Sequence, residues 1–580
     1  MTMAGSQGKI VGVNGNMITV QFDGAVVQNE VGYAEVDADT RLMSEVVRVR
    51  GDYADLQVFE DTTDLAVGAN VAFTGEMLAV ELGPGLLTQI FDGLQNPLPK
   101  LAEQLGFFLQ RGTYLEALPR EPSWPFTPSV EQGAVLTAGE ALGHVPEGIF
   151  EHRIMVPFGQ AGNLTVEEIA AAGEYRVEDV IARLRDGKGA QHEVRLMQRW
   201  PVKLPIKAYA ERLRPTDALT TKVRIIDTFF PVARGGTYCI PGPFGAGKTV
   251  LQQITSRHAE VDIVVVAACG ERAGEVVETL RTFPELTDPR TGRSLMERTV
   301  IICNTSSMPV AAREASVYTA VTIAEYYRQM SLNVLLLADS TSRWAQALRE
   351  VSGRLEEIPG EEAFPAYLES VIAGFYERGG IVRLKDGSVG SVTIGGTVSP
   401  AGGNFDEPVT QSTLKVVGAF HGLARARSDA RRYPAIDPLD SWSKYFTVVE
   451  PESMEFGRRM LRDGHEVGQM MKVVGEEGTT IEDFVLYLKS EYLDAVYLQQ
   501  DAFDEVDGAT TAERQRYVFE VMLRILRSPM RFKDKEDARR FFHQLTQTTN
   551  DWNRQAQDKP EFKQTQARLE QMVAEVTQRA

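Results

Sequence analysis

The chain of 580 residues is too long for a single hydrophobic core, so we expect three or four domains. Its composition, with 43% apolar, 24% charged and 8% aromatic residues, is ordinary for a globular protein and excludes disorder as the main state. The 80 acidic residues outnumber the 61 basic ones, and the resulting charge of -19 argues against a general nucleic-acid coat.

Cysteine, histidine and apolar patterns narrow the class of protein further. Cys239, Cys269 and Cys303 form no CxxC pair and the histidines form no HxxxH pattern, so we expect reduced, intracellular cysteines and no zinc site. Residues 1–9 lack the apolar core of a signal peptide, and no stretch approaches the roughly 20 apolar residues of a membrane-spanning helix. We therefore expect any role at a membrane to come through partners.

The first seventy-odd residues contain closely spaced short strands, which the sequence predicts at 10–13, 17–20, 45–49 and 56–59. The first two flank Asn14-Gly15-Asn16 and the last two flank Gly51-Asp52, which are turn residues that tolerate a positive φ. Such strands predict a small β-barrel over residues 1–75, with a structural rather than a catalytic role.

Residues 115–200 differ in character from the chain on either side. They carry short polar–apolar alternations and six prolines, at positions 119, 122, 125, 128, 146 and 157. We expect a β-rich insertion here, within an α/β domain of residues 76–114 and 201–440.

The centre of the chain alternates short apolar runs with amphipathic stretches. The runs are residues 237–240, 262–268, 299–303 and 334–338. This alternation predicts parallel strands with crossover helices. After residue 441 long amphipathic stretches dominate, with helices expected at 481–500 and 511–526, so residues 441–580 should form a helical domain.

A phosphate-binding loop is the strongest chemical signal. It fits GxxxxGK[ST] between a predicted strand and a predicted helix, and it consists of Gly242, Pro243, Phe244, Gly245, Ala246, Gly247, Lys248 and Thr249. Its glycines let backbone N–H groups surround a phosphate, Lys248 can neutralise the β- and γ-phosphates, and the Thr249 hydroxyl can bind magnesium. The alternative is an ordinary glycine turn.

Acidic residues follow two of the predicted strands. Asp339 ends the apolar run 334–338 and can bind magnesium beside the phosphate loop, although an acid at this place is often only a helix cap. Glu271 follows the run 262–268, where its carboxylate can polarise the attacking water while Arg272 offsets phosphate charge. The alternative for Glu271 and Arg272 is a surface pair at a loop start.

Read together, these motifs resemble those of the catalytic A subunits of the V-type/A-type rotary ATPases. The resemblance extends along nearly the whole chain, through residues 81–87, 242–249, 270–272, 338–350, 359–362, 375–378, 399–408 and 499–507. The segment 115–200 matches the insertion that distinguishes this subunit from the related F-type β subunit. The resemblance implies an N-terminal β-barrel, a central α/β P-loop (RecA-like) domain with a β-rich insertion, and a C-terminal helical domain.

The same resemblance implies the activity and the partners. It implies ATP hydrolysis or synthesis, with ATP/ADP and magnesium as ligands, coupled through stalk rotation to transport of an ion that we expect to be a proton. The implied partners are three non-catalytic B subunits in an alternating ring, which supply an arginine finger in trans, a central rotor stalk, a peripheral stalk and a membrane sector contacted indirectly. We expect no nucleic-acid partner and a peripheral location on the cytoplasmic face of a membrane.

Further expectations concern four individual residues and one acidic segment. The resemblance implies that Glu271 activates water and that Tyr433 packs on adenine, the alternative for Tyr433 being a core tyrosine beside proline. Arg343 either approaches the γ-phosphate or pairs with a carboxylate. Ala246 stands where many eukaryotic members have cysteine, so we expect no thiol switch in the loop. The acidic segment 491–507 is our expected region of stalk contact.

Two other functions compete with this interpretation. A hexameric helicase or secretion-type ATPase has a similar nucleotide core, but the insertion and the lack of a clear RNA-binding aromatic–basic cluster argue against it. A non-catalytic nucleotide-binding subunit could dispense with the glutamate, so an intact Lys248, Thr249 and Glu271 argue against that role.

Overall fold

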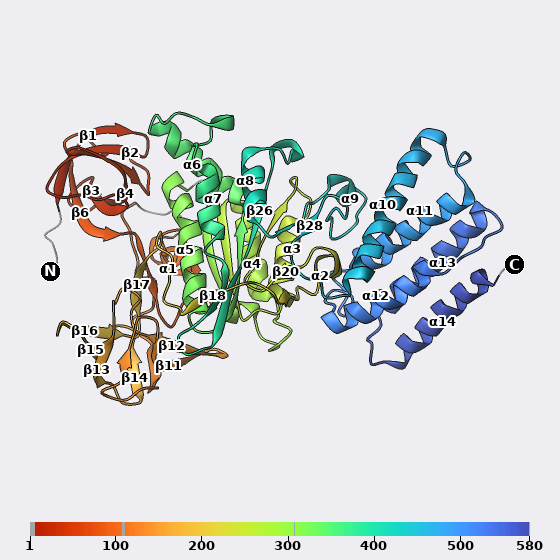
Figure 1. Ribbon diagram of the computed structural model, residues 1–580. Coiled ribbons are helices and arrows are strands. Elements are labelled where there is room, and N and C mark those ends of the chain that lie inside the picture. Colours follow the sequence, from red (N-terminus) through yellow and green to blue (C-terminus); the bar gives the residue numbers. More distant parts are fainter. Residues whose placement is uncertain (1–5, 107–110, 307, 579–580) are drawn as a thin grey trace. The chain divides into compact units, whose positions relative to one another are not determined.

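The structure is a computed structural model that describes residues 6–106, 111–306 and 308–578 and divides into two compact units (Figure 1). The first unit contains Met1–Arg214, Val261–Val398 and Asp406–Val416. The second contains Pro215–Glu260, Ser399–Phe405 and Val417–Ala580. The predicted domains 1–75 and 441–580 include residues 1–5 and 579–580, which lie outside the described residues.

In the first unit, six strands close the N-terminal β-barrel in the order β1-β2-β5-β4-β3-β6. They are β1 (Gln7–Asn14), β2 (Met17–Asp23), β3 (Glu30–Glu35), β4 (Arg41–Arg50), β5 (Tyr53–Val58) and β6 (Asn70–Met77). Apolar residues on the inner face of each strand fill the barrel, and Val20, Leu42 and Leu56 are fully buried. Both predicted hairpin turns form, with a positive φ at Gly15 and Gly51.

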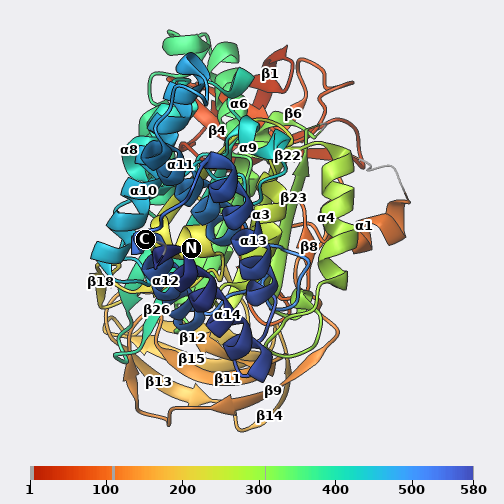
Figure 2. The ribbon, with the colours of Figure 1, turned by 90° about the vertical axis from the view of Figure 1, so that its right-hand side faces the viewer.

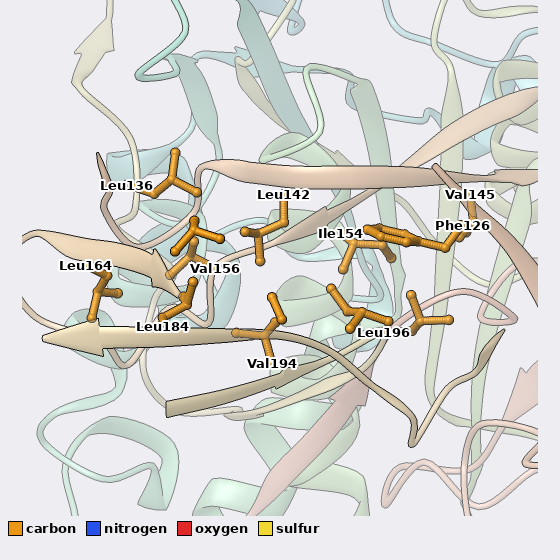
Figure 3. Packing of buried hydrophobic residues seen from close by; sticks show 13 residues of the cluster. Phe126, Leu136, Leu142, Val145, Ile154, Val156, Leu164, Leu184, Val194 and Leu196 are labelled. Atoms are coloured by element: carbon orange, nitrogen blue, oxygen red, sulfur yellow. The ribbon is translucent and has the colours of Figure 1, made fainter. Parts of the chain in front are cut away.

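The segment 115–200 folds as the predicted β-rich insertion. Two antiparallel sheets, in the orders β10-β13-β15-β16 and β12-β11-β9-β14, enclose one core that includes Leu142, Val156 and Leu184 (Figure 3). The strands are β9 (Ser123–Pro128), β10 (Val135–Leu136), β11 (Ala141–Glu147), β12 (Phe150–Met155), β13 (Leu164–Ile169), β14 (Gly173–Arg176), β15 (Val180–Asp186) and β16 (Gln191–Arg195). The segments before and after the insertion lie side by side, because β7 (Ala79–Leu82) pairs with β17 (Gln198–Pro201).

A parallel sheet in the order β26-β24-β22-β23-β8 forms the centre of the first unit. Its strands β22, β23 and β8 can be followed side by side in Figure 2. The strands are β8 (Ile90–Phe91), β22 (Ile263–Glu271), β23 (Thr299–Thr305), β24 (Asn333–Asp339) and β26 (Val389–Val398), with β25 (Gly380–Arg383) and β18 (Glu211–Leu213) added antiparallel. The apolar runs are buried on both faces, as parallel strands require.

Helices connect the strands of this sheet. They are α1 (Leu98–Leu105), α4 (Ala273–Glu285), α5 (Val310–Arg328), α6 (Thr341–Arg354), α7 (Leu368–Tyr376) and α8 (Pro408–Val416). Helix α5 packs along β22, β23, β24 and β26, so it covers most of one face of the sheet. The alternation of strand and helix predicted for this region is therefore confirmed.

The second unit begins with short strands around the phosphate loop and ends in helices. Strand β21 (Thr237–Pro241) pairs parallel with β27 (Ala419–Phe420), and β27 pairs antiparallel with β28 (Trp442–Ser443). The helices are α2 (Arg224–Phe229), α3 (Lys248–His258), α9 (Arg425–Asp429), α10 (Pro451–Val474), α11 (Ile481–Leu493), α12 (Ala512–Arg527), α13 (Lys535–Asn553) and α14 (Pro560–Thr577). Together the two units confirm the predicted fold class: a β-barrel, an α/β domain with a β-rich insertion, and a helical C-terminal domain.

Two predicted boundaries are wrong. The helix expected over 481–500 is α-helical only to Leu493 and continues as a π-helical turn, Asp494–Leu498, in which Arg427 and Arg432 hold the Asp494 carboxylate. Strand β22 runs through Glu271 instead of ending at residue 268. None of the helices in the described part of the chain is long and apolar enough to cross a membrane.

Candidate active site

The phosphate loop of the second unit has the strand–loop–helix setting that the sequence predicts. Strand β21 ends at Pro241, residues 242–247 form the loop, and α3 begins at Lys248. Gly245 and Gly247 have φ values of 79° and 90°, a region that a residue with a Cβ rarely enters. Helix α3 therefore begins directly after a loop whose backbone an anion can approach closely.

Lys248 lies against the inner side of this loop. Its ammonium donates hydrogen bonds to the carbonyl oxygens of Gly242 at 2.8 Å and Pro243 at 3.0 Å. Thr249 follows on the first turn of α3, which places its hydroxyl next to the same loop. Lys248 and Thr249 thus lie at the loop where the sequence predicts phosphate and magnesium binding.

Tyr433 lies next to the phosphate loop within the same unit. A Cβ built on Gly247 would lie 3.8 Å from Cε2 of the Tyr433 ring. The ring lines a pocket of about 330 Å³, together with Val250, Gln499, Ala502 and the 96% exposed Phe503. Burial raises the pKa of the Tyr433 hydroxyl, so the ring is a neutral, flat surface at the edge of the loop.

In the first unit, Glu271 and Asp339 end two neighbouring parallel strands. Asp339 is the last residue of β24, and its Oδ1 accepts a hydrogen bond of 2.6 Å from the Thr397 hydroxyl. Strand β22 has an irregularity between Cys269 and Glu271, where Gly270 adopts a φ of 75°. The two carboxylates therefore lie at one edge of the sheet, as the sequence predicts.

The electrostatics of Glu271 differ from those of a surface glutamate. Burial raises its pKa, the negative charge of Asp339 and a hydrogen bond to Glu275 raise it further, and the Arg343 guanidinium lowers it, giving a value of about 8. A carboxyl group with this pKa can exchange a proton near neutral pH, which is what a general base requires.

Arg272 and Arg343 lie at the beginnings of helices beside these carboxylates. Arg272 precedes α4 as its N-cap and is exposed. Arg343 lies in the first turn of α6 and donates a hydrogen bond of 3.2 Å to the Gln346 side chain. Both cations therefore stand close in sequence to the acidic residue of their own strand.

Comparisons with known proteins match domains of one protein family in three parts of the chain. The ATP synthase alpha/beta family, nucleotide-binding domain, matches residues 222–443, its barrel-sandwich domain matches residues 115–203, and its beta-barrel domain matches residues 10–75. The V-type ATP synthase alpha chain of Treponema denticola is 64% identical over 573 residues, which cover 99% of this chain and 97% of the relative. This chain belongs to the family of V-type ATP synthase alpha chains. Alpha chain 1 of Treponema pallidum is 65% identical over 95% of this chain and 93% of its own length, and the alpha chain of Borrelia recurrentis is 62% identical over 94% and 95%.

The membership confirms the resemblance that the motifs indicate. Within this alpha chain, the second unit brings together the phosphate loop and Tyr433, and the first brings together Glu271, Asp339 and Arg343. The sequence did not single out Phe503 and Gln499 as lining the Tyr433 pocket. Their only local signal was an apolar Phe within an acidic segment, because the pocket forms through contacts between distant parts of the chain.

Proposed function

We propose that this alpha chain is the catalytic subunit of a rotary V/A-type ATPase, which couples ATP hydrolysis or synthesis to ion transport across a membrane through stalk rotation. The observation that carries the proposal is the phosphate loop, in which two glycines have positive φ and the Lys248 ammonium lies against the loop carbonyls of Gly242 and Pro243. Close identity over almost the full length of V-type ATP synthase alpha chains supports the same function.

The loop and the strand-end carboxylates fit a nucleotide with magnesium. Thr249 and Asp339 offer oxygen donors, which a hard cation such as Mg²⁺ prefers, and the bond from Thr397 orients the Asp339 carboxylate. We propose that these two residues hold the magnesium ion, which when bound neutralises phosphate charge. Lys248 exchanges its two loop carbonyls for the β- and γ-phosphates of ATP or the β-phosphate of ADP, and the non-proline residues of 242–247 offer their backbone N–H groups.

We propose that Glu271 activates the attacking water. Its carboxylate accepts a proton from the attacking water, and its raised pKa makes it a strong enough base to do so near neutral pH. Arg272 is proposed to offset phosphate charge, and Tyr433 to stack on the adenine ring with Phe503 lining the same pocket. In the synthesis direction the same groups act in reverse.

The proposed activity requires assembly with other subunits. We propose an alternating ring with three non-catalytic B subunits, each supplying an arginine finger, and a central and a peripheral stalk that link the ring to a membrane sector at the cytoplasmic face. The transported ion is proposed to be a proton. The chain is proposed to act through four parts: a barrel (1–75), a nucleotide domain (76–114 and 201–440), an insertion (115–200) and a helical domain (441–580).

Steady-state turnover of magnesium-ATP tests the proposal, measured with the purified full chain alone and after addition of the non-catalytic subunit. Low activity alone and strong activity on assembly would support a site completed in trans. Equal activity in both, or stimulation by nucleic acid, would refute it. In the assembled complex, Glu271→Gln should keep nucleotide binding and lower turnover by about 10²–10⁴-fold, because it removes only the base.

A further inference from the structure

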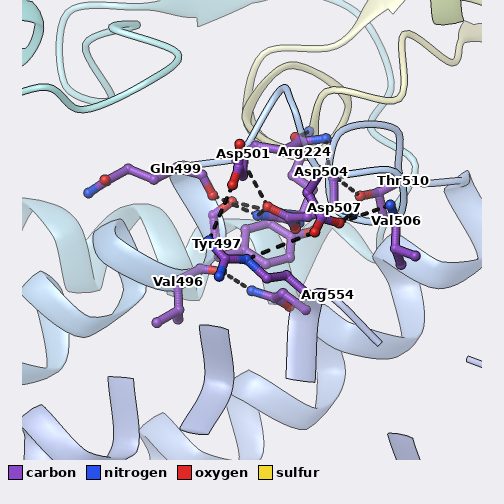
Figure 4. A network of polar contacts seen from close by, with 12 residues as sticks. Arg224, Val496, Tyr497, Gln499, Asp501, Asp504, Val506, Asp507, Thr510 and Arg554 are labelled. Atoms are coloured by element: carbon purple, nitrogen blue, oxygen red, sulfur yellow. Dashed lines mark hydrogen bonds and ion pairs between the residues drawn. The ribbon is translucent and has the colours of Figure 1, made fainter. Parts of the chain in front are cut away.

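A buried guanidinium in the second unit holds a loop that contributes to the Tyr433 pocket. Arg224, the first residue of α2, is 2% exposed, and its side chain donates hydrogen bonds to the carbonyl oxygens of Tyr497 at 3.0 Å and Gln499 at 2.6 Å (Figure 4). It also forms an ion pair with Asp507. The backbone N–H of Arg224 donates to the Gln500 side chain at 2.8 Å, so one residue fixes both ends of the segment 499–507.

This segment, which we call the clamp loop, residues 499–507, has no regular secondary structure and depends on such bonds for its shape. The Asp507 carboxylate accepts a hydrogen bond of 2.8 Å from the backbone N–H of Asp501. The Gln500 side chain donates to the carbonyl oxygen of Asp507 at 2.7 Å, which closes the loop on itself. Asp507 therefore links the Arg224 cation directly to the loop backbone.

The clamp loop is also bonded to the residue that we propose as the base contact. The backbone N–H of Gln500 donates to the carbonyl oxygen of Tyr433 at 2.9 Å. Clamp-loop residues 499–503 and 507 line the same 330 Å³ pocket as Tyr433. A change in the loop would consequently change the wall of this pocket while leaving the Lys248 contacts within the phosphate loop intact.

The chemistry of Arg224 suits this task better than that of any other side chain. A guanidinium has five donors in a planar fork, and here they reach two carbonyl oxygens and a carboxylate at once. A lysine ammonium keeps the charge but has no fixed fork, so it cannot hold these acceptors in the same arrangement. Because both charges are buried, removing one partner leaves the other without compensation.

We propose that Arg224 is a positioning residue for nucleotide recognition, which holds the clamp loop in place so that the pocket accepts the base of ATP. The inference rests on the proposed role of the Tyr433 pocket as the base site. Arg224 acts through the loop and contacts no phosphate, so it sets the affinity for the base-bearing part of the nucleotide and leaves the affinity for a bare triphosphate unchanged.

The test compares two ligands by titration calorimetry on the full chain: magnesium-ATP and magnesium-tripolyphosphate, which lacks the base and the ribose. Arg224→Lys should bind magnesium-ATP about tenfold more weakly, the factor expected when one further backbone residue must be ordered on binding. Its affinity for tripolyphosphate should stay within about twofold of the wild-type value. Asp507→Asn, which keeps the side-chain shape and removes the charge, should show the same pattern. It replaces Arg224→Lys in the test if that variant does not fold.

Arg298→Lys is the matched control. Arg298 is 1% exposed and pairs with Asp288 at 2.9 Å, yet neither residue lines the Tyr433 pocket, so the ratio of the two affinities should not change. Equal weakening of both ligands by Arg224→Lys and Asp507→Asn, or no weakening, would overturn the positioning role. A wild-type chain that binds ATP no better than tripolyphosphate would instead refute the proposed base site, and tripolyphosphate binding unaffected by Lys248→Ala would refute the phosphate site.

Discussion

Changing the charges around Glu271 should move the pH at which this ATPase becomes active, in opposite directions for two variants. The Glu271 carboxyl has a pKa of about 8 because burial, Asp339 and Glu275 raise it, whereas Arg343 lowers it. Only the ionised carboxylate can accept a proton from water, so kcat/KM should rise with pH through a midpoint near 8 and level off above about 9. Glu275→Gln should move this rise to lower pH, and Arg343→Gln should move it to higher pH.

The size of the effect follows from the contributions to this pKa. Burial is the largest cause of the difference between the ordinary value of 4.5 and about 8, and the charges of Asp339, Glu275 and Arg343 contribute less, so removing Glu275 or Arg343 should move the rise by at most about one pH unit. For a full unit, the ionised fraction at pH 7 would increase from about one tenth to about one half in Glu275→Gln, so the gain in kcat/KM should be at most about fivefold. In Arg343→Gln the ionised fraction should fall, by at most about ninefold.

Initial rates of phosphate release by the assembled complex, measured at low magnesium-ATP between pH 6 and 9.5, would give kcat/KM for each variant. Glu278→Gln is the matched control, because Glu278 lies exposed on the same helix α4 and does not contribute to the pKa of Glu271. A wild-type kcat/KM that stays constant from pH 6 to 9.5, or a shift of both variants in the same direction, would refute the assignment of Glu271 as the base.

Other parts of the chain give further predictions. Lys248→Ala should abolish measurable ATP binding in equilibrium dialysis, because it removes the cation from the phosphate loop; retained binding would contradict that role. Burial lowers the pKa of His421 from its ordinary value of 6.5 to about 4. Between these two pH values only the unfolded state takes up the proton, so the free energy of unfolding should fall by about 3 kcal/mol as the pH is lowered from 6.5 to 4. Urea titrations would measure this loss, and a His421→Gln variant with the same pH dependence would rule out the histidine. Leu184→Ala, in the fully buried core of the insertion, should lower the free energy of unfolding by about 2–5 kcal/mol in the same assay. A substitution of the exposed Val135 by alanine is the control and should change this free energy little.

Features that depend on neighbouring residues could be read from the sequence. The phosphate loop was predicted together with its strand and helix, because glycines with positive φ and a helix start are specified within eight consecutive residues. Both barrel hairpins were predicted from their turn residues for the same reason. The position of Asp339 followed from the rule that parallel strands end at one edge of a sheet.

Features that depend on distant residues could not be read in this way. The extension of β22 through Glu271 requires the irregularity at Gly270, which an apolar pattern that stops at residue 268 does not reveal. At the end of α11, Asp494 is held by arginines that lie more than sixty residues upstream, which a local helical pattern does not reveal. The bond between Arg224 and Asp507 joins residues 283 positions apart, and no local pattern specifies such a pair.

The same long-range pairing changes the interpretation of the acidic segment 491–507. In the sequence it suggests an exposed acidic face, and we expected the stalk to contact it there. In the structure Glu491 pairs with Arg432, Asp494 pairs with Arg427 and Arg432, and Asp507 pairs with Arg224. Its carboxylates are largely compensated by cations of the same unit, so they set the shape of the segment rather than a free negative surface. Reversing the charge of these carboxylates should therefore disturb the clamp loop and weaken ATP binding. A loss of rotation in such a variant would count as evidence of stalk contact only if its nucleotide affinity stayed unchanged.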